Sequence, residues 1–244
     1  MIRQPEDKEF KLWNEKKSTD IRAERRSDYW LSQMIVDPSK SIMEIGCGAG
    51  LKAYILARKS GMNILATDID PEEIALAKRD YQLPNLKFMV VDSTELDRTE
   101  VSSFDYIVGN GILHHLYHHI DSALTNMLRI LKDNGKIIFI EPNIYNPFVH
   151  YIFSYPSGRK MAHLDPDEMA FSKSFITKKL IAAGYQDVKV EYKDFLLPGI
   201  PDSLIKPSIV IGDVLEKIPL IKNVSQSIFI SAVKKNDLRS EVID

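Results

Sequence analysis

A short glycine-rich loop between two apolar segments limits the folds open to this chain. After an apolar run at 41–45 the sequence reads Gly46-Cys47-Gly48-Ala49-Gly50, and a helical pattern follows at 51–59. Alternate glycines let a backbone take positive φ angles and approach a ligand closely. A strand, a glycine loop and a helix in this order indicate a nucleotide or dinucleotide site at one end of a parallel sheet.

Short β-branched runs alternate with helical periodicity from residue 41 onward, which is typical of a wound α/β sheet. Asp70-Pro71 marks one helix start, because an N-cap acid precedes a proline at the first helical position. We expect strands at 41–45, 63–67, 86–91, 104–108, 136–140, 187–192 and 227–233. We expect helices at 51–59, 71–81, 120–131, 172–183 and 208–217.

The pattern divides the chain into three parts. We expect an N-terminal helical cap over 1–40, one α/β domain over 41–234 and a tail over 235–244. Two stretches of the domain, at about 142–172 and 194–225, are rich in aromatic residues or proline, and we interpret them as inserted lid segments. The lid segments and the aromatic residues of the N-terminal cap are candidates for an acceptor pocket, with core packing as the competing interpretation of Trp13, Tyr29 and Trp30.

Composition excludes several classes of protein. The 244 residues include 32 Lys+Arg and 34 Asp+Glu, a formal net charge of −2. This balance argues against nucleic acid as a partner, and Arg22, Arg25 and Arg26 stand among acids, as on a solvated helix face. The single cysteine cannot form an internal disulfide, and no apolar run approaches the ~18 residues of a membrane span. We therefore expect a soluble, cytoplasmic protein.

Three acids at the ends of the first three predicted strands indicate the type of ligand. Glu44 lies just before the glycine loop, where it would repel a pyrophosphate and attract a cation. Asp68 ends the second strand, where a carboxylate can accept hydrogen bonds from a ribose diol. Asp92 follows the third strand and could accept an adenine amino proton. The structural alternatives are an amide cap or ion pair for Glu44, an Asx turn for Asp68, and a cap of the turn at 94–96 for Asp92.

These acids belong to a longer series of motifs that share one order and spacing. The series is Glu44-Ile45-Gly46-Cys47-Gly48-Ala49-Gly50, Asp68, Asp92, the segment 104–116 with Asn110 and His114, and Leu131-Lys132-Asp133-Asn134-Gly135. Over residues 41–141 the chain resembles the class I S-adenosylmethionine-dependent methyltransferases. The resemblance implies a doubly wound, Rossmann-like seven-stranded α/β sheet with the last strand antiparallel, and a cofactor across the carboxyl ends of the first strands.

The resemblance also implies S-adenosylmethionine as the cofactor and S-adenosylhomocysteine as its product. S-adenosylmethionine carries a sulfonium and an ammonium but no phosphate, so an acidic frame of Glu44, Asp68 and Asp92 complements it and opposes NAD. The implied contacts to the methionine portion are from Gly46, Cys47, Gly48 and, largely by backbone, Asn110. The implied contacts to the ribose and adenine are from Asp68, Ile69, Asp92 and Ser93.

Two departures from the family pattern bear on the acceptor. Glu44 stands where an Asp is more usual. The segment Gly109-Asn110-Gly111-Ile112 replaces the Asn-Pro-Pro-aromatic pattern of methyltransferases that act on nucleobase amino groups. With the near-neutral charge, this favours a small-molecule acceptor over a nucleic acid.

Four histidines follow the fourth predicted strand. His114 and His118, like His115 and His119, are spaced i and i+4, which on a helix can present two metal ligands. No cysteine joins them, and we expect no metal. We nominate His114 as the residue that faces the acceptor. It would act as a general base or as a structural hydrogen-bonding group beneath the acceptor.

We therefore expect an S-adenosylmethionine-dependent methyltransferase that moves a methyl group to a small-molecule acceptor, at oxygen, by in-line displacement. The alternatives are a non-catalytic cofactor-binding or interaction module of the same fold, an NAD-dependent oxidoreductase and an RNA methyltransferase. Segments 141–147 and 167–172 weakly resemble methyltransferases of sugar, polysaccharide or lipid biosynthesis. Apolar residues at 195–197 and 209–211 suit a lipid-linked acceptor or the packing of a lid on the sheet. The oligomeric state stays open.

Overall fold

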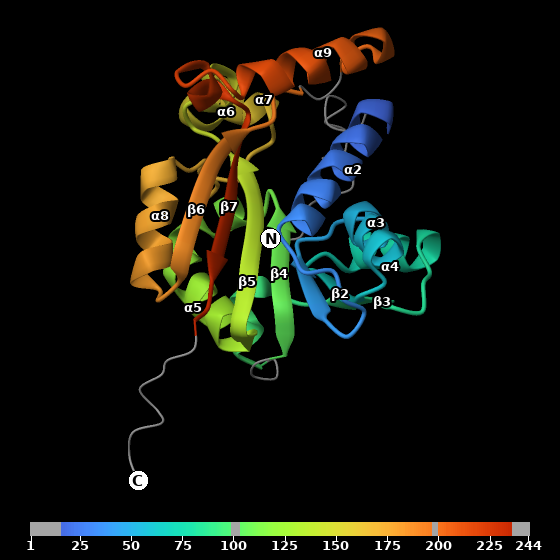
Figure 1. Cartoon of the computed structure of the whole chain (residues 1–244). Helices are drawn as coiled ribbons and strands as arrows, with labels where there is room; N and C mark the ends of the chain where they lie inside the picture. Colours follow the sequence, from blue (N-terminus) through green and yellow to red (C-terminus); the bar gives the residue numbers. More distant parts are fainter. Residues whose placement is uncertain (1–15, 99–102, 197–199, 236–244) are drawn as a thin grey trace.

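A computed structural model describes residues 16–98, 103–196 and 200–235. Seven strands of the described part form one sheet in the order β3-β2-β1-β4-β5-β7-β6 (Figure 1). β1 to β5 pair in parallel, and β7 is antiparallel to both of its neighbours. The predicted seven-stranded, doubly wound sheet is confirmed. The strands are β1 Ser41–Ile45, β2 Asn63–Asp68, β3 Leu86–Val90, β4 Phe104–Asn110, β5 Leu131–Pro142, β6 Gln186–Lys193 and β7 Ser227–Val233.

Helices pack on both faces of this sheet. Side chains of α2, α3 and α4 join one buried apolar cluster, and side chains of α5 and α8 join another. The α-helices are α2 Lys16–Ser32, α3 Leu51–Ser60, α4 Pro71–Asp80, α5 Ile120–Ile130, α6 Pro147–Ser154, α7 Pro156–Met161, α8 Lys173–Ala182 and α9 Asp202–Leu215. The 3₁₀ helices of the described residues are η2 Ser93–Arg98, η3 Leu113–His119 and η4 Ile221–Val224.

The start of α4 follows from its local sequence. Asp70 caps the helix by accepting a hydrogen bond from the backbone N of Glu72 at 2.8 Å, and Pro71 occupies the first turn. Proline at this position forfeits no helical hydrogen bond, since the first N–H groups have no partner within the helix. The predicted cap is confirmed.

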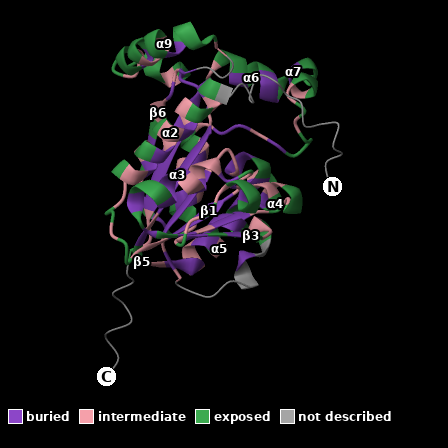
Figure 2. Cartoon of the chain, turned by 90° about the vertical axis from the view of Figure 1, so that its right-hand side faces the viewer, coloured by how far each residue is buried: buried purple, intermediate pink, exposed green. Residues whose placement is uncertain are grey.

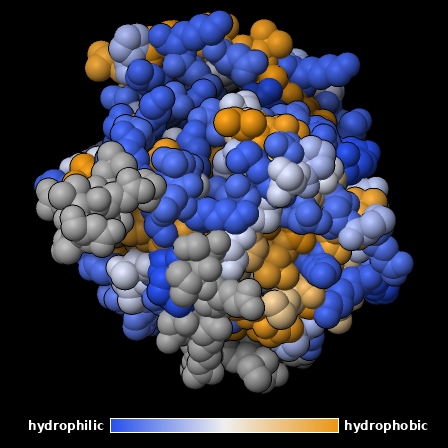
Figure 3. All heavy atoms as spheres, turned by 60° about the horizontal axis from the view of Figure 1, so that its bottom comes forward, coloured by the Kyte–Doolittle hydropathy of each residue, from blue (hydrophilic) through white to orange (hydrophobic). Residues whose placement is uncertain are grey.

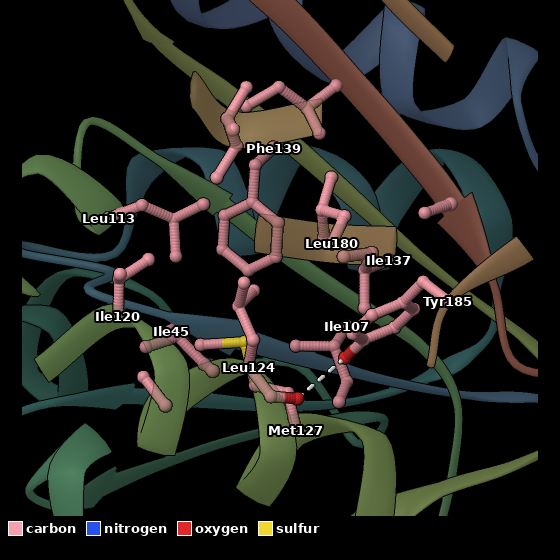
Figure 4. Close-up of a cluster of buried hydrophobic side chains, with 14 of the residues drawn as sticks. Ile45, Ile107, Leu113, Ile120, Leu124, Met127, Ile137, Phe139, Leu180 and Tyr185 are labelled. Atoms are coloured by element: carbon pink, nitrogen blue, oxygen red, sulfur yellow. Dashed lines mark hydrogen bonds between the residues drawn. The ribbon is translucent and has the colours of Figure 1, made fainter. Parts of the chain in front are cut away.

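The core between α5 and the sheet is apolar and tightly packed. Phe139 of β5 is fully buried between α5 and the sheet, with Ile107 and Leu124 beside it (Figure 4). The hydroxyl of Tyr185 donates to the carbonyl of Leu124 at 3.1 Å, so the one polar atom of this buried ring has a partner (Figure 4). Trp30 is also fully buried, which confirms core packing for that residue. Trp13 lies outside the described residues.

Two predicted elements, β5 and α9, differ from the structure by more than a few residues. β5 is longer than predicted and includes the expected turn, where Asn134 takes a φ of 59°. α9 starts at Asp202 rather than 208, with Pro207 inside it. Proline inside a helix lacks one backbone N–H and crowds the carbonyl four residues before it, and buried Ile205 anchors the turn that precedes Pro207. The first inserted segment contains α6 and α7.

α6, α7 and α9 lie above the end of the sheet at which β4 and β5 finish (Figures 1 and 2). Many of their residues are exposed, whereas the strands below them are largely buried (Figure 2). With the lower end turned forward the surface is mostly hydrophilic, with apolar residues in several places and the largest group of them below the centre of the view (Figure 3). Among the described residues, no helix combines the length and the apolar character that crossing a membrane requires.

Candidate functional site

The glycine loop joins β1 to α3 and has the backbone form that its sequence predicts. Gly46 has a φ of 68°, and a Cβ there would lie 2.8 Å from Ile112, which is too close for a side chain. Gly48 has a φ of 52°, and a Cβ there would meet only Glu73, at 3.9 Å. At Gly46 the loop therefore packs against Ile112, in the segment that follows β4. At Gly48 the loop is open, and a ligand can approach the backbone there.

Glu44, on β1 just before the loop, is the least satisfied charged group of the site. It is fully buried, and neither carboxylate oxygen has a hydrogen-bond partner within the described part of the chain. Burial is the main cause that raises the pKa of Glu44 to about 7; the charge of Lys52 opposes the shift, and the charge of Asp68 adds to it. The amide cap and the ion pair considered for Glu44 are not formed by described residues. A buried carboxylate without a partner is costly and fits a cationic group brought by a ligand.

Asp68 is the last residue of β2, and its side chain is hydrogen-bonded to the glycine loop. Its Oδ2 accepts a hydrogen bond from the backbone N of Gly48 at 2.8 Å, and its Oδ1 accepts one from Asp70 N at 3.0 Å. The Asx turn considered as an alternative is therefore present. Each carboxylate oxygen has a second lone pair, so the same group can still accept from ligand hydroxyls.

The predicted adenine side lies at the neighbouring strand end. The backbone N of Val91 donates to the Asp68 carbonyl at 3.0 Å, which holds the end of β3 beside that of β2. Asp92 Oδ1 accepts from the backbone N and the hydroxyl of Thr94, at 2.8 and 2.7 Å, so Asp92 does cap the following turn. Ser93 opens η2, and Ile69 is 64% exposed. The structure therefore places these predicted residues along one edge.

Two further predicted residues flank the loop. Cys47 is buried, and burial, with the charges of Glu44 and Asp68, raises the pKa of its thiol, so it is an unreactive packing residue. Asn110 ends β4, and its Oδ1 accepts a hydrogen bond from Arg26 Nη1 at 2.7 Å. That contact was not anticipated, because Arg26 belongs to α2, far away in the sequence.

The prediction of a solvated face for the arginine cluster is wrong for Arg22 and Arg26. Their side chains are only 12% and 13% exposed. Arg26 Nη2 lies 2.7 Å and Arg22 Nη2 3.9 Å from the buried carboxylate of Asp194, which follows β6. Burial raises the pKa of Asp194, but the two guanidinium groups outweigh it and hold that pKa below its usual range. The physical reason is that α2 packs against the sheet, so the i, i+4 pair faces inward.

A cleft of about 280 Å³ opens beside these arginines, between α2 and the ends of β6 and β7, with Tyr29 and Phe229 in its lining. A larger hollow of about 620 Å³ lies between α4 and β3, at Tyr81 and Phe88. The larger hollow contains none of the predicted site residues, so its size alone does not make it a functional site.

His114, the nominated acceptor-facing residue, is held by a buried carboxylate. Glu141, near the end of β5, accepts backbone hydrogen bonds from Ile112 at 3.0 Å, Leu113 at 2.8 Å and His114 at 3.3 Å. The same carboxylate lies 2.9 Å from His114 Nδ1. Because an ionised carboxylate can only accept, it favours the proton on Nδ1 and leaves Nε2 as the basic atom. The sequence analysis missed this role of Glu141.

A second buried carboxylate, that of Glu168, lies on the other side of the histidines. His115 Nδ1 is 3.0 Å from Glu168 Oε1, and His114 Nε2 is 3.9 Å from Oε2. Burial raises the pKa of Glu168, but the hydrogen bond and charges of the two histidines outweigh it, and the net pKa is lowered. His114, His115 and Glu168 each offer an atom within 4.8 Å of the others, a geometry that can hold a metal ion.

This group of three differs from the histidine pairs considered in the sequence. η3 is interrupted at Leu116, with φ −97° and ψ 16°, so residues 114 and 118 do not share a regular helix. Glu168 comes from the first inserted segment, far along the chain. In the sequence, the one feature that pointed to Glu168 was its position as an acid in the aromatic-rich inserted segment. The prediction of no metal stays a prediction.

The comparisons with known proteins agree with the fold. Residues 43–139 match the family described as "Methyltransferase domain". Among curated proteins, the chain is 31% identical over 99 residues to the ribosomal protein L11 methyltransferase of Lactobacillus acidophilus, covering 41% of this chain and 30% of the relative. It is 30% identical over 103 residues to the phthiotriol/phenolphthiotriol dimycocerosates methyltransferase of Mycobacterium leprae, covering 42% and 37%. The chain thus spans about a third of the length of these relatives.

Solved structures extend the likeness over most of the chain. A SAM-dependent methyltransferase from Archaeoglobus fulgidus has a TM-score of 0.63 at 18% identity, covering 88% of this chain and 94% of that one. The phosphoethanolamine N-methyltransferase 2 of Haemonchus contortus, in complex with S-adenosyl-L-methionine, has a TM-score of 0.63 at 17% identity, covering 87% and 53%. At these identities the likeness shows a shared fold.

Proposed function

From the premise that this chain contains a methyltransferase domain with the fold of class I S-adenosylmethionine-dependent methyltransferases, we propose that it transfers a methyl group from that cofactor to a small-molecule acceptor, at oxygen. The observation that carries the proposal is the buried, unpartnered carboxylate of Glu44 beside an open glycine loop. S-adenosylmethionine supplies an electrophilic methyl group on a sulfonium and carries an ammonium, and no part of it is a phosphate.

The described residues fit this cofactor. Glu44 offers two oxygens to a cation, and the backbone at Gly48 is open to a close ligand. Asp68 offers remaining lone pairs to a ribose. Three carboxylates at adjoining strand ends would repel a diphosphate, so the site favours this cofactor over NAD. Asp92 and Ser93, with Ile69, would flank the adenine, and Gly46, Cys47 and Asn110 the methionine end.

His114 is the proposed catalytic residue. Its Nδ1 is paired with Glu141, so Nε2 is the atom that would take the proton of an acceptor hydroxyl. Glu141 is held by three backbone amides and acts as a positioning residue that fixes the orientation of the ring. Beyond this, methyl transfer needs mainly an acceptor oxygen held in line about 3 Å from the methyl group, with water excluded.

The small-molecule acceptor rests on the near-neutral charge and on the absence of the nucleobase-type motif after β4. The relatives named above are methyltransferases of a ribosomal protein and of complex lipids, so a protein or lipid acceptor is the competing proposal. The division of the chain into cap, domain and tail and its cytoplasmic location stay predictions.

A screen of acceptors tests the proposal. Purified protein and S-adenosylmethionine are incubated with small alcohols, phenols, amines and acids, and S-adenosylhomocysteine release is measured. We expect release with a hydroxyl-bearing compound, and its loss in His114→Asn. Binding of S-adenosylhomocysteine without release across the panel would favour a non-catalytic module of the same fold. Binding of NAD instead would favour an oxidoreductase.

A further inference from the structure

The outer face of α9 exposes apolar side chains that no described element covers. Val210 is 65% exposed, Val214 53% and Leu220, in the turn after the helix, 83%. We define the α9 stripe as the six exposed residues Leu204, Val210, Ile211, Val214, Ile218 and Leu220. The sequence left two interpretations for the apolar run at 209–211, and the exposure of Val210 and Ile211 excludes packing on the sheet for both.

The stripe lies on one side of α9. At about 100° per residue, Leu204, Val210, Ile211 and Val214 fall within roughly a third of the helix circumference. Buried Ile205 and Gly212 lie on the opposite side, where Gly212 packs against Phe195. The helix is therefore amphipathic with its apolar side outward, and such contiguous apolar exposure marks an interaction surface.

The acidic residues of this region have partners on the protein. Asp202 pairs with Lys17 of α2 at 2.8 Å, and Asp213 pairs with Arg25 of α2 at 2.9 Å. Glu216 accepts a hydrogen bond from the backbone N of Asp194 at 2.8 Å. The acids of α9 and its C-terminal turn thus contact α2 and the end of β6 rather than the outer margin of the stripe.

The lysines of this region have a different environment. Lys206, Lys217 and Lys222 are exposed, and none forms an ion pair with another residue of the described ranges. By helical position, Lys206 borders the stripe, and Lys217 and Lys222 stand beside Ile218 and Leu220 in the sequence. An apolar stripe with basic residues at its margin, next to acids that are already paired, complements an apolar layer beneath negative charges.

We propose that the α9 stripe is a docking surface for a lipid bilayer that carries anionic headgroups. Apolar side chains would enter the boundary between headgroups and acyl chains, and the three lysines would lie at the headgroups. α9 lies over the end of the sheet that holds the candidate site (Figure 1), so docking would bring the site to the membrane surface. The proposal does not depend on methyl transfer, but if both hold, it favours the competing lipid acceptor over a soluble small molecule.

Vesicle binding tests the proposal. The full chain is centrifuged with vesicles of phosphatidylcholine alone or with 30 mole per cent phosphatidylglycerol. We expect binding to the anionic vesicles that weakens with salt. A triple variant, Val210→Ser, Ile211→Ser and Val214→Ser, should lower the partition coefficient at least tenfold. The matched control is Ile181→Ser, which removes an apolar residue that is 60% exposed on α8, and it should bind as the unchanged protein does.

Charge is tested separately. Each of Lys206→Ala, Lys217→Ala and Lys222→Ala should weaken binding to anionic vesicles about fivefold. All variants should bind S-adenosylhomocysteine as the unchanged protein does, which separates this proposal from the proposed function and controls for folding. No binding to anionic vesicles, or equal binding by the triple variant, would overturn the proposal. A dimer in light scattering that the triple variant makes monomeric, without vesicle binding, would also overturn it and assign the stripe to a second copy of the chain.

Discussion

The glycine-loop edge and the layer formed by α6, α7 and α9 lie at the same end of the sheet but are built in different ways. At the loop edge, Glu44, Asp68 and Gly48 are close in sequence, and their carboxylates and amides either bond one another or are buried without a partner. In the layer formed by α6, α7 and α9, apolar side chains are exposed, and polar contacts join segments far apart in the sequence, as Asp213 of α9 does with Arg25 of α2. The difference supports two separate proposals, a polar ligand at the first region and an apolar partner at the second.

The largest effect is expected where the two regions meet, at His114. His114→Asn should lower turnover with any active acceptor at least a hundredfold, because it removes Nε2, the atom proposed to take the proton of the acceptor. Binding of S-adenosylhomocysteine should stay the same. His118→Asn, a change at an exposed histidine, is the control and should retain full turnover. Equal turnover in both variants would leave His114 with a structural role only.

A smaller effect is expected at the tip of β2. Asp68→Ala should weaken S-adenosylhomocysteine binding about tenfold or more, since it removes both the bond to the loop and the acceptor for a ribose. Asp70→Ala is the matched control. It removes the helix cap and should cost about 1 kcal/mol of unfolding free energy while leaving the binding constant unchanged. Calorimetric titration and urea unfolding measure the two quantities, and equal binding by both variants would remove Asp68 from the ligand site.

The tight packing of the loop gives a third test. Gly46 and Gly61 share a φ of 68°, but a Cβ would lie 2.8 Å from Ile112 at Gly46 and no closer than 3.8 Å to Pro38 at Gly61. Alanine at either position is strained by the backbone angle, and only Gly46→Ala adds overlap. We expect Gly46→Ala to be less stable than Gly61→Ala by about 1–3 kcal/mol in urea unfolding. Equal losses of unfolding free energy would mean that the Ile112 side chain can move away from the added methyl group at no cost, and that its packing does not fix the position of the loop.

The smallest effect is expected from metal removal. Turnover should be the same with and without EDTA, because hydrogen bonds with Glu141 and Glu168 already engage the two histidines. Turnover that EDTA abolishes and one divalent ion restores would identify His114, His115 and Glu168 as metal ligands. It would also contradict the proposed role of His114 as a base.

The two regions also differ in how much of them the sequence could predict. The strand, loop and cap signals from Ser41 to Pro71 are local, because glycine angles and an aspartate cap act within a few residues. They gave β1, α3 and α4 nearly to their ends. Glu141 directly follows the strand predicted at 136–140, but its bond to His114 depends on how β4 and β5 align. Glu168 and Arg26 reach the site only through the packing of α2 and of the first inserted segment.

The layer formed by α6, α7 and α9 was the least predictable from the sequence. The sequence predicted a helix at 208–217, but the helix begins at Asp202, because buried Ile205 holds a turn before Pro207. The apolar run at 209–211 fitted burial and exposure equally well, since periodicity shows that a helix has two sides but not which one faces the core. The side that α9 buries depends on tertiary contacts such as that of Gly212 with Phe195.

The most direct test of the account is the pH dependence of S-adenosylhomocysteine binding, measured by calorimetry in the unchanged protein and in Glu44→Gln. The pKa of Glu44 is raised to about 7, so the free protein holds this group largely protonated at pH 5.5 and must ionise it to bind an ammonium. Affinity should therefore rise about tenfold or more between pH 5.5 and 7.5. It should be weaker and nearly independent of pH in Glu44→Gln. Equal affinities and equal pH profiles for the two proteins would contradict the claim that Glu44 receives the cation of the cofactor.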